Sequence, residues 1–146
     1  MNRWNIGVDV TDITRFRRLN YRENRRFYTR IFTQEEIKHC LSSKDPAPNF
    51  AANFSAKEAV YKALNNFFDI KLNQIEIRRN EQGSPHVNLL LNRKETAREP
   101  RSEATQPLEI KVSLSHSTSH AIAFAVVRCS KELQETPATD QKGASK

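Results

Sequence analysis

Three ionisable residues in two separate segments have the types and spacing to bind a metal ion and a phosphate group. Asp9 interrupts an apolar segment near the N-terminus, and Glu58 and Lys62 stand four residues apart in FSAKEAVYKAL at 54–64. Residues four apart share a helix face, where a carboxylate and an ammonium usually form an ordinary surface ion pair. Mg²⁺, however, is commonly held by one or two carboxylates together with substrate phosphates. The three residues are therefore candidates for a magnesium–phosphate site.

The elements that must position these residues follow from hydrophobic periodicity. Residues 4–11 alternate between apolar and polar or small side chains, which predicts a strand with Asp9 on the face opposite the buried one. Gly7, on the same face as Asp9, is expected to leave room for a ligand. The segment 54–64 has no Gly or Pro and predicts part of a long helix from about residue 50 to 65. The apolar residues of the strand are Trp4, Ile6, Val8 and Val10.

The N-terminal part of the chain is strongly basic. The 146 residues carry a net charge of +7, and residues 1–32 hold eight arginines against three carboxylates. Asp12 is a suitable N-cap for a helix that starts near Ile13 and is predicted to continue to about Thr29. Such a cationic stripe is often only a solvated face, but it also attracts an acidic protein or a nucleic acid. Its members, three or four residues apart, are Arg15, Arg18, Arg22, Arg25 and Arg26.

The remaining segments predict an α+β fold with an antiparallel sheet packed by helices. Thr33 and Glu36 form a capping-box pattern at the start of a helix. The turn QGSP at 82–85 joins predicted strands at 75–79 and 87–91, and two more strands are predicted at 110–114 and 121–127. Residues 92–107 are expected to form a loop or short helix. The polar tail 129–146 is expected to be disordered, which leaves one domain at 1–128.

Composition and cysteine usage narrow the class of protein. No apolar run is long enough for a membrane span, and no apolar signal segment stands at the start, so neither a membrane nor export is expected. Cys40 and Cys129 have neither metal-ligand nor disulfide-framework spacing, and we interpret them as free thiols of a cytoplasmic protein. No zinc-finger or RNA-binding motif is present, so a nucleic-acid partner is not expected.

Five segments stand in an order that is typical of one enzyme family. They are GVDVTDITRF at 7–16, RIFTQEE at 30–36, FSAKEAVYKAL at 54–64, QGSP at 82–85 and VSLSHSTSHAIAFAVV at 112–127. In this order the chain resembles the holo-[acyl-carrier-protein] synthases, the small bacterial type of 4'-phosphopantetheinyl transferase. The aspartate in a G-x-D strand combined with x-x-K-E-A-x-x-K is specific, whereas either piece alone is weak. The resemblance covers nearly all of the chain except its tail.

The resemblance implies a fold, a reaction and roles for the three ionisable residues. The fold is the 4'-phosphopantetheinyl transferase fold, and the reaction moves phosphopantetheine from coenzyme A to a serine of apo-acyl carrier protein in fatty acid biosynthesis. Asp9 and Glu58 are then the ligands of Mg²⁺, which stabilises charge on the pyrophosphate, and Lys62 meets that pyrophosphate. Glu58 and Lys62 are the catalytic residues. Whether Glu58 takes the serine proton directly or through a metal-bound water stays open.

The resemblance also predicts where coenzyme A and the carrier protein bind. Gly83 and Pro85 in the hairpin turn, and Ser115 and His116 in the serine-rich segment, are predicted to contact coenzyme A. The small acidic acyl carrier protein is predicted to dock on the basic helix. The family's small members form homotrimers, with each active site at a boundary between subunits. The docking residues are Arg15, Arg18, Arg22 and Arg25.

The chain departs from the family pattern on the side expected to handle coenzyme A phosphates. A basic residue commonly precedes the F-[AS]-A-K-E-A run, and here Asn53 stands there; a Gly-rich turn commonly follows the helix, and here Asn65 begins that segment. The metal-binding pair is unaffected. The alternative hypothesis is a basic, non-catalytic binding module that grips an acidic protein or RNA.

Overall fold

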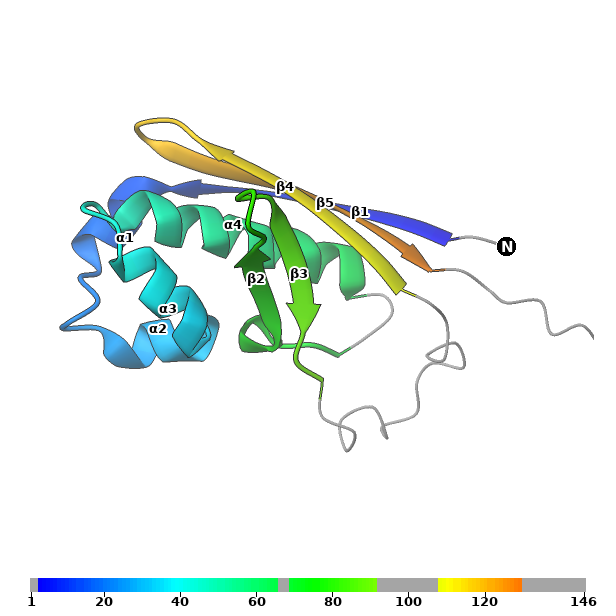
Figure 1. The fold of residues 1–146 in the computed structure, drawn as a ribbon, viewed down its shortest axis with the longest axis horizontal. Coiled ribbons are helices and arrows are strands. Elements are labelled where there is room, and N and C mark those ends of the chain that lie inside the picture. The colour runs from blue at the N-terminus through cyan, green and yellow to red at the C-terminus, as the bar shows by residue number, and fades with distance from the viewer. Residues whose placement is uncertain (1–2, 66–68, 92–107, 130–146) are drawn as a thin grey trace, which may run out of the picture.

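The computed structural model describes residues 3–65, 69–91 and 108–129, and these form helices packed on antiparallel sheets (Figure 1). This arrangement confirms the predicted α+β class. The predicted segment 92–107 and the tail from residue 130 onward lie outside the described residues. The elements are β1 (Arg3–Asp12), α1 (Ile13–Arg18), α2 (Arg25–Ile31), α3 (Gln34–Leu41), α4 (Ala47–Leu64), the 3₁₀ helix η1 (Leu72–Gln74), β2 (Ile75–Arg79), β3 (Pro85–Leu89), β4 (Leu108–His116) and β5 (His120–Cys129).

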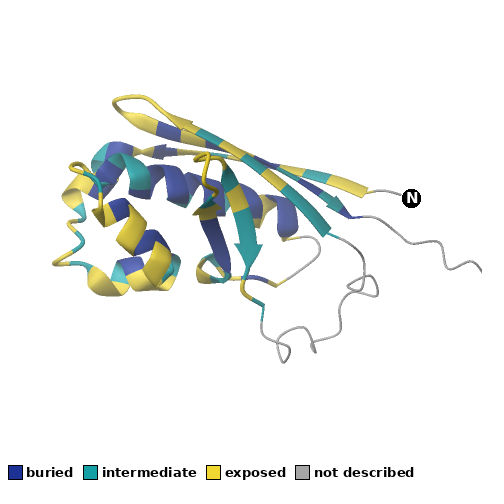
Figure 2. Cartoon of the chain, in the orientation of Figure 1, coloured by how far each residue is buried: buried dark blue, intermediate teal, exposed yellow. Residues whose placement is uncertain are grey.

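The larger sheet has the strand order β1-β5-β4, and helix α4 lies along one of its faces (Figure 1). Both pairs of neighbours are antiparallel, so β5 is the central strand and β1 and β4 are the edges. Strands β2 and β3 form a separate hairpin, in which β3 lies against β4 and β2 against α4. Helix α4 is buried along most of its length (Figure 2).

Small residues allow α4 to lie very close to the sheet. Ala59 and Ala63 of α4 are fully buried against β5, whose inward residues include Ala123 and Ala125. At Gly7 a Cβ atom would lie 1.9 Å from the carbonyl oxygen of Ala59, a distance that no pair of non-bonded atoms tolerates. Gly7 is therefore required for close packing of β1 on α4. The expectation that Gly7 leaves room for a ligand is wrong, because the helix occupies that space.

The prediction of which face of β1 is buried is also wrong. The strand alternates as expected, but Gly7 and Thr11 are buried under α4 and Asp9 is largely covered, whereas the apolar residues face outward. Trp4 is 61% exposed and Val8 is 52% exposed. Period-two patterning identifies the residues that share a face, but the packing of α4 decides which face is covered.

The predicted basic helix from Ile13 to Thr29 is interrupted. Asp12 caps α1 as expected, with its Oδ1 accepting from the Thr14 N–H at 2.8 Å. The helix then ends after Arg18, and α2 starts only at Arg25. In the connection, Asn20 Oδ1 accepts a hydrogen bond from the Arg22 N–H at 2.9 Å, a turn that competes with helical hydrogen bonding. The arginines therefore belong to two short helices and a loop.

A buried ion pair sets the position of α4 relative to α3 and β2. Lys57 Nζ lies 2.6 Å from Glu36 Oε2 and also donates to the Ile75 carbonyl, and both side chains are almost fully buried. Glu36 also accepts from the N–H of Thr33 at 2.8 Å, which completes the predicted capping box, and from the N–H of Ile77 at 2.9 Å. Because every charged atom has a partner, the pair orients α4 about its axis.

Helix length and hydropathy also bear on membrane insertion. Within residues 3–65, 69–91 and 108–129, no helix combines the length and the apolar character that a membrane span requires.

Candidate active site

The structure brings Asp9, Glu58 and Lys62 together at the β1 edge of the larger sheet. Asp9 lies on the β1 face that packs on α4, and Lys62 Nζ donates to Asp9 Oδ1 at 2.9 Å and to the Val8 carbonyl at 2.9 Å. Thr11 donates from its hydroxyl to the other Asp9 oxygen at 3.1 Å. Glu58 stands one helical turn before Lys62 and is close enough to Asp9 for the two charges to repel. The predicted association of the strand carboxylate with the helix pair is therefore present.

Glu58 is the group in this cluster whose charge is least well compensated. Among the described residues it has no ion pair or hydrogen bond with another side chain, whereas Asp9 is paired with Lys62. Partial burial, followed by the repulsion from Asp9, raises the pKa of Glu58, and Lys62 and Arg15 only partly oppose this rise. Two neighbouring carboxylates in a half-buried position constitute an arrangement that a bound cation would stabilise.

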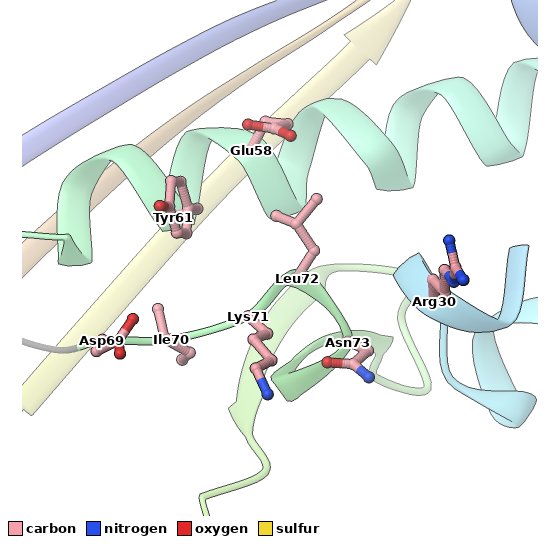
Figure 3. Close-up of a pocket in the computed structure, with 8 residues that line it drawn as sticks. All are labelled: Arg30, Glu58, Tyr61, Asp69, Ile70, Lys71, Leu72 and Asn73. Carbon is pink, nitrogen blue, oxygen red and sulfur yellow. The ribbon is translucent and has the colours of Figure 1, made fainter. Parts of the chain in front are cut away.

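An open cleft of about 570 Å³ extends from Glu58 toward the segment before β2 (Figure 3). Glu58 and Tyr61 line it from α4, and Arg30 approaches from α2 (Figure 3). Arg30 and Lys71 are the cationic residues among those that line it, and the Lys71 side chain points away from α4 (Figure 3). The other lining residues are Asp69, Ile70, Leu72 and Asn73.

The residues predicted to contact coenzyme A lie elsewhere in the chain. Gly83 stands in the β2–β3 turn with a φ of 81°, and Pro85 begins β3. Ser115 and His116 end β4, and both side chains are exposed. Strand β5 separates β4 from β1, so Ser115 and His116 lie two strands across the sheet from Val10 and Thr11.

The arginines predicted to dock a carrier protein are distributed over three segments. Arg15 and Arg18 lie on α1, Arg22 lies in the loop, and Arg25 is the first residue of α2; all four are exposed. The Arg15 guanidinium lies 5.0 Å from the centre of the Phe54 ring, a cation–π contact, and Arg15 also lowers the pKa of Glu58. Arg15 is thus linked electrostatically to the Glu58 cluster, and Arg25 lies 5.8 Å from the centre of the Tyr21 ring.

Several side chains at or near the site were not identified from the sequence. The sequence could have placed Tyr61 near the site, since it stands three residues after Glu58 on a neighbouring part of the same helix surface. The sequence could not have placed Arg30 there, because α2 reaches the cleft only through tertiary packing. Asn53, where the sequence departs from the family pattern, is buried in α4, and its Oδ1 accepts a hydrogen bond of 3.4 Å from Arg79 Nη2.

A comparison with known protein families and sequences matches nearly the same part of the chain as the five motifs. The family model described as the 4'-phosphopantetheinyl transferase superfamily matches residues 5–125. A holo-[acyl-carrier-protein] synthase of Thermodesulfovibrio yellowstonii is 33% identical over 123 residues, which cover 84% of this chain and 96% of that protein. One of Clostridium perfringens is 38% identical, with 84% of this chain and 91% of that protein covered.

Solved structures of similar fold carry the same family name. The Helicobacter pylori holo-[acyl-carrier-protein] synthase in complex with coenzyme A has a TM-score of 0.65 at 27% identity, covering 84% of this chain and 98% of that one. The Bacillus anthracis synthase in complex with coenzyme A (3',5'-ADP) has a TM-score of 0.64 at 25% identity, covering 86% of this chain and 96% of that one.

Proposed function

The chain belongs to the holo-[acyl-carrier-protein] synthases of the 4'-phosphopantetheinyl transferase superfamily, and we propose that coenzyme A and an apo-acyl carrier protein are its substrates. A serine hydroxyl of the carrier attacks the phosphorus that bears the pantetheine arm. A P–O bond forms, the bond to the leaving phosphate breaks, and 3',5'-ADP departs while the serine proton is taken up by a base. The observation that carries the proposal is the cluster of Asp9, Glu58 and Lys62 on β1 and α4.

The donor set of this cluster fits a magnesium ion. Asp9 and Glu58 offer hard carboxylate oxygens, and within the described residues no three His, Cys, Asp or Glu side chains gather as a complete protein-made metal site. A centre held by two carboxylates and completed by substrate phosphates and water is the usual situation for Mg²⁺. When bound, the ion would supply charge stabilisation for the pyrophosphate oxygens. We propose Asp9 and Glu58 as its protein ligands.

Lys62 and Glu58 have separate roles in this proposal. The Lys62 side chain is 48% exposed, so its ammonium can reach a phosphate oxygen while the Asp9 carboxylate holds it in place. It would neutralise charge that develops on the leaving phosphate. Glu58, directly or through a water, is the candidate to accept the serine proton, because its carboxylate has no ion-pair partner among the described residues.

The position of the predicted coenzyme A residues supports a site shared between copies of the chain. Gly83 and Pro85 belong to the β2–β3 hairpin and Ser115 and His116 to the edge strand β4, whereas Asp9 belongs to the other edge strand, so a neighbouring copy could present them to the cluster. The outer face of β1 and β5 is apolar and exposed, which is unusual for a monomer. We propose that this face joins copies into a homotrimer. Its residues include Trp4, Ile6, Val8, Val10, Ile122 and Phe124.

The remaining assignments concern docking and cellular role. Arg18, Arg22 and Arg25 are exposed, and none of the three forms an ion pair with a described carboxylate. Together with Arg15 they would attract the acidic carrier protein and orient its serine toward Glu58. We place the reaction in fatty acid biosynthesis in the cytoplasm, with the predicted domain at 1–128 sufficient for it once Cys129, the buried last residue of β5, is included.

Intact-mass spectrometry tests the proposal directly. A bacterial apo-acyl carrier protein is incubated with the full chain, coenzyme A and Mg²⁺, and a parallel sample contains EDTA. We expect the carrier to gain one phosphopantetheine only when metal is present. Glu58→Gln should abolish the gain, whereas Glu81→Gln, at the exposed hairpin tip, should not. An unchanged carrier mass with the wild-type chain and metal would contradict the proposed reaction for that carrier, and transfer by Glu58→Gln would contradict the site.

A further inference from the structure

The Asp9 carboxylate is held at both of its oxygens, unlike the Glu58 carboxylate beside it. Lys62 Nζ donates to Asp9 Oδ1 at 2.9 Å, and the Thr11 hydroxyl donates to Asp9 Oδ2 at 3.1 Å. Glu58 has no such contact with a side chain among the described residues. The orientation of the Asp9 carboxylate is therefore fixed by two donors, one charged and one neutral.

The packing of strand and helix places the Thr11 hydroxyl at Asp9. The two residues are two positions apart on β1, so their side chains share the face that α4 covers. In the register, the residues opposite them on β5 are Ala121 and Ala123, and both are buried. The neighbouring strand therefore offers Asp9 no polar side chain at these positions, and Thr11 supplies the hydrogen bond from β1 itself.

The two donors to Asp9 differ in burial and in stiffness. Thr11 is 5% exposed, whereas the Lys62 side chain is 48% exposed. Threonine is branched at Cβ, which restricts its χ1, whereas lysine carries its ammonium on a flexible stem. Lys62 also divides its three N–H donors between Asp9, the Val8 carbonyl and, in the proposed reaction, a phosphate. Thr11 is therefore the more rigid of the two restraints on Asp9.

A hydroxyl in this position leaves room for a cation on the same carboxylate. A carboxylate has about four lone-pair sites on its two oxygens, so Asp9 can accept from Thr11 and Lys62 and still bind a metal. Hydrogen bonds to a ligating carboxylate orient it, and without them the torsion that turns the carboxylate plane is broad. Loss of the Thr11 hydroxyl should therefore let the carboxylate turn, and a metal must then order it on binding.

We propose that Thr11 is a positioning residue whose hydroxyl holds the Asp9 carboxylate in the orientation that receives Mg²⁺. The inference rests on the proposed transferase function, because Mg²⁺ at Asp9 and Glu58 belongs to that function. In this role Thr11 acts through Asp9 and touches neither the metal nor the substrates. It lowers the Mg²⁺ concentration that the chain requires and leaves the turnover of the metal-loaded chain unchanged.

The test removes the hydroxyl and keeps the shape of the side chain. Transfer to apo-acyl carrier protein by Thr11→Val and by wild type is measured at saturating coenzyme A over a series of Mg²⁺ concentrations. We expect the half-maximal Mg²⁺ concentration to rise roughly tenfold, the usual effect of losing a hydrogen bond to a metal ligand, while kcat at saturating Mg²⁺ stays near the wild-type value. Urea unfolding with coenzyme A and no carrier protein is a readout independent of turnover, in which the same Mg²⁺ concentrations should stabilise Thr11→Val less than wild type.

Two further comparisons separate the hydrogen bond from general damage to the fold. Ser55→Ala is the matched control, because Ser55 is also buried between α4 and the sheet, and its hydroxyl donates to the Ala121 carbonyl at 3.3 Å rather than to a carboxylate. It should lower the free energy of unfolding and leave the half-maximal Mg²⁺ concentration unchanged. Thr11→Ser and Thr11→Ala differ by the hydroxyl alone, so the alanine variant should require more Mg²⁺ than the serine variant, whether or not the chain accommodates valine.

The outcomes distinguish this inference from the proposed function. An unchanged Mg²⁺ requirement in folded Thr11→Val, or an equal rise for Thr11→Ser and Thr11→Ala, would overturn the inference. A fall in kcat that excess Mg²⁺ does not restore would also overturn it, because a residue that only positions a metal ligand does not limit the metal-loaded chain. All three results leave wild-type transfer intact. If wild type itself transfers nothing, or transfers equally in EDTA, the proposed function fails and this inference fails with it.

Discussion

At the scale of single residues, the proposed active site stores an electrostatic cost that substrate and metal would relieve. Glu58 is held beside Asp9 in a half-buried position, and its pKa is raised by burial first and by Asp9 second. A carboxylate kept near another carboxylate does not stabilise the chain, so its presence is better explained by a role in binding. Lys57, the preceding residue, faces the opposite way into the ion pair with Glu36. Of these two adjacent residues, Lys57 therefore stabilises the fold and Glu58 has the proposed role in binding.

This cost predicts how pH changes the stability of the metal-free chain. Because the folded-state pKa of Glu58 is raised above its unfolded value, ionisation disfavours the folded state as pH rises through the ordinary carboxylate range toward that pKa. Below that range Glu58 is protonated in both states and the penalty is absent. Metal-free Glu58→Gln, which stays neutral, should be more stable than wild type near neutral pH and equal to it in acid. Urea unfolding in EDTA at several pH values measures this difference.

Addition of Mg²⁺ should reverse the order near neutral pH. A ligand that binds only the folded state raises the free energy of unfolding, and Glu58→Gln lacks one of the two proposed ligand carboxylates. A Glu58→Gln variant that is less stable than wild type without metal would show that Glu58 stabilises the fold, against the reasoning above.

At the scale of elements, the close contact between β1 and α4 determines whether the cluster exists. Asp9 is on the strand and Glu58 and Lys62 are on the helix, so the 2.9 Å contact between Lys62 and Asp9 depends on the spacing of these two elements. Gly7 sets that spacing, since its missing Cβ leaves room for the Ala59 carbonyl. The strand and the helix therefore act as one unit in positioning the proposed catalytic groups.

Substitution of Gly7 should damage both stability and activity. Gly7→Ala places a methyl group against helix backbone that cannot move aside, and we expect a loss of about 3 kcal/mol in the free energy of unfolding, as for severe overpacking. Gly83→Ala is the matched control: its φ of 81° is unfavourable for alanine, but no atom lies within 4 Å, so we expect a loss of about 1 kcal/mol. Equal losses for the two variants in urea unfolding would contradict the packing role of Gly7.

The docking surface belongs to α1, α2 and the loop between them. Reversal of two charges in Arg18→Glu/Arg22→Glu should lower kcat/KM for the carrier protein roughly tenfold at low salt, because electrostatic attraction accelerates encounter. The effect should shrink as salt is added, and the affinity for coenzyme A should be unchanged. Lys38→Glu is the control, because it makes the same change of charge at an exposed residue of α3. It should have little effect on kcat/KM for the carrier protein. A loss in kcat/KM that does not depend on salt, or no loss at all, would rule out docking at these arginines.

At the scale of the whole molecule, two observations support the association of several copies of the chain. One is the exposed apolar face, and the other is that the predicted site residues lie on separate edges of the sheet. The face formed by β1 and β5 is apolar in two adjacent rows, with Val8 opposite Phe124 in the register. The predicted coenzyme A residues lie at the other edge of the sheet from Glu58. Both observations fit the proposed site shared between copies, and the apolar face provides a surface on which copies can associate.

Charge on this face should separate the copies and stop transfer without unfolding the chain. Val8 is 52% exposed, so Val8→Lys places an ammonium where the lone chain already meets water but an assembly would not. Sedimentation should show a trimer for wild type and a monomer for Val8→Lys. The variant should also lose transfer activity, because its copies no longer associate. Glu81→Lys, at the exposed hairpin tip, is expected to remain assembled and active. An unchanged mass for Val8→Lys would place any interface elsewhere.

The local pattern of the sequence was sufficient to predict the fold class, the capping of α1 and α3, the strands and the residues of the metal-type cluster. The capping of α1 and α3 depends on neighbours in the chain, such as Asp12 with Thr14, and Glu58 and Lys62 lie within one helix; the contact of Lys62 with Asp9, however, joins segments far apart. Tertiary structure decided three other features. Periodicity could not show that α4 covers the Gly7 and Asp9 face of β1, that Arg30 reaches the cleft, or that Arg79 lies against Asn53. Each depends on a contact between segments far apart in the chain, and the spacing of residues within one segment carries no information about such a contact.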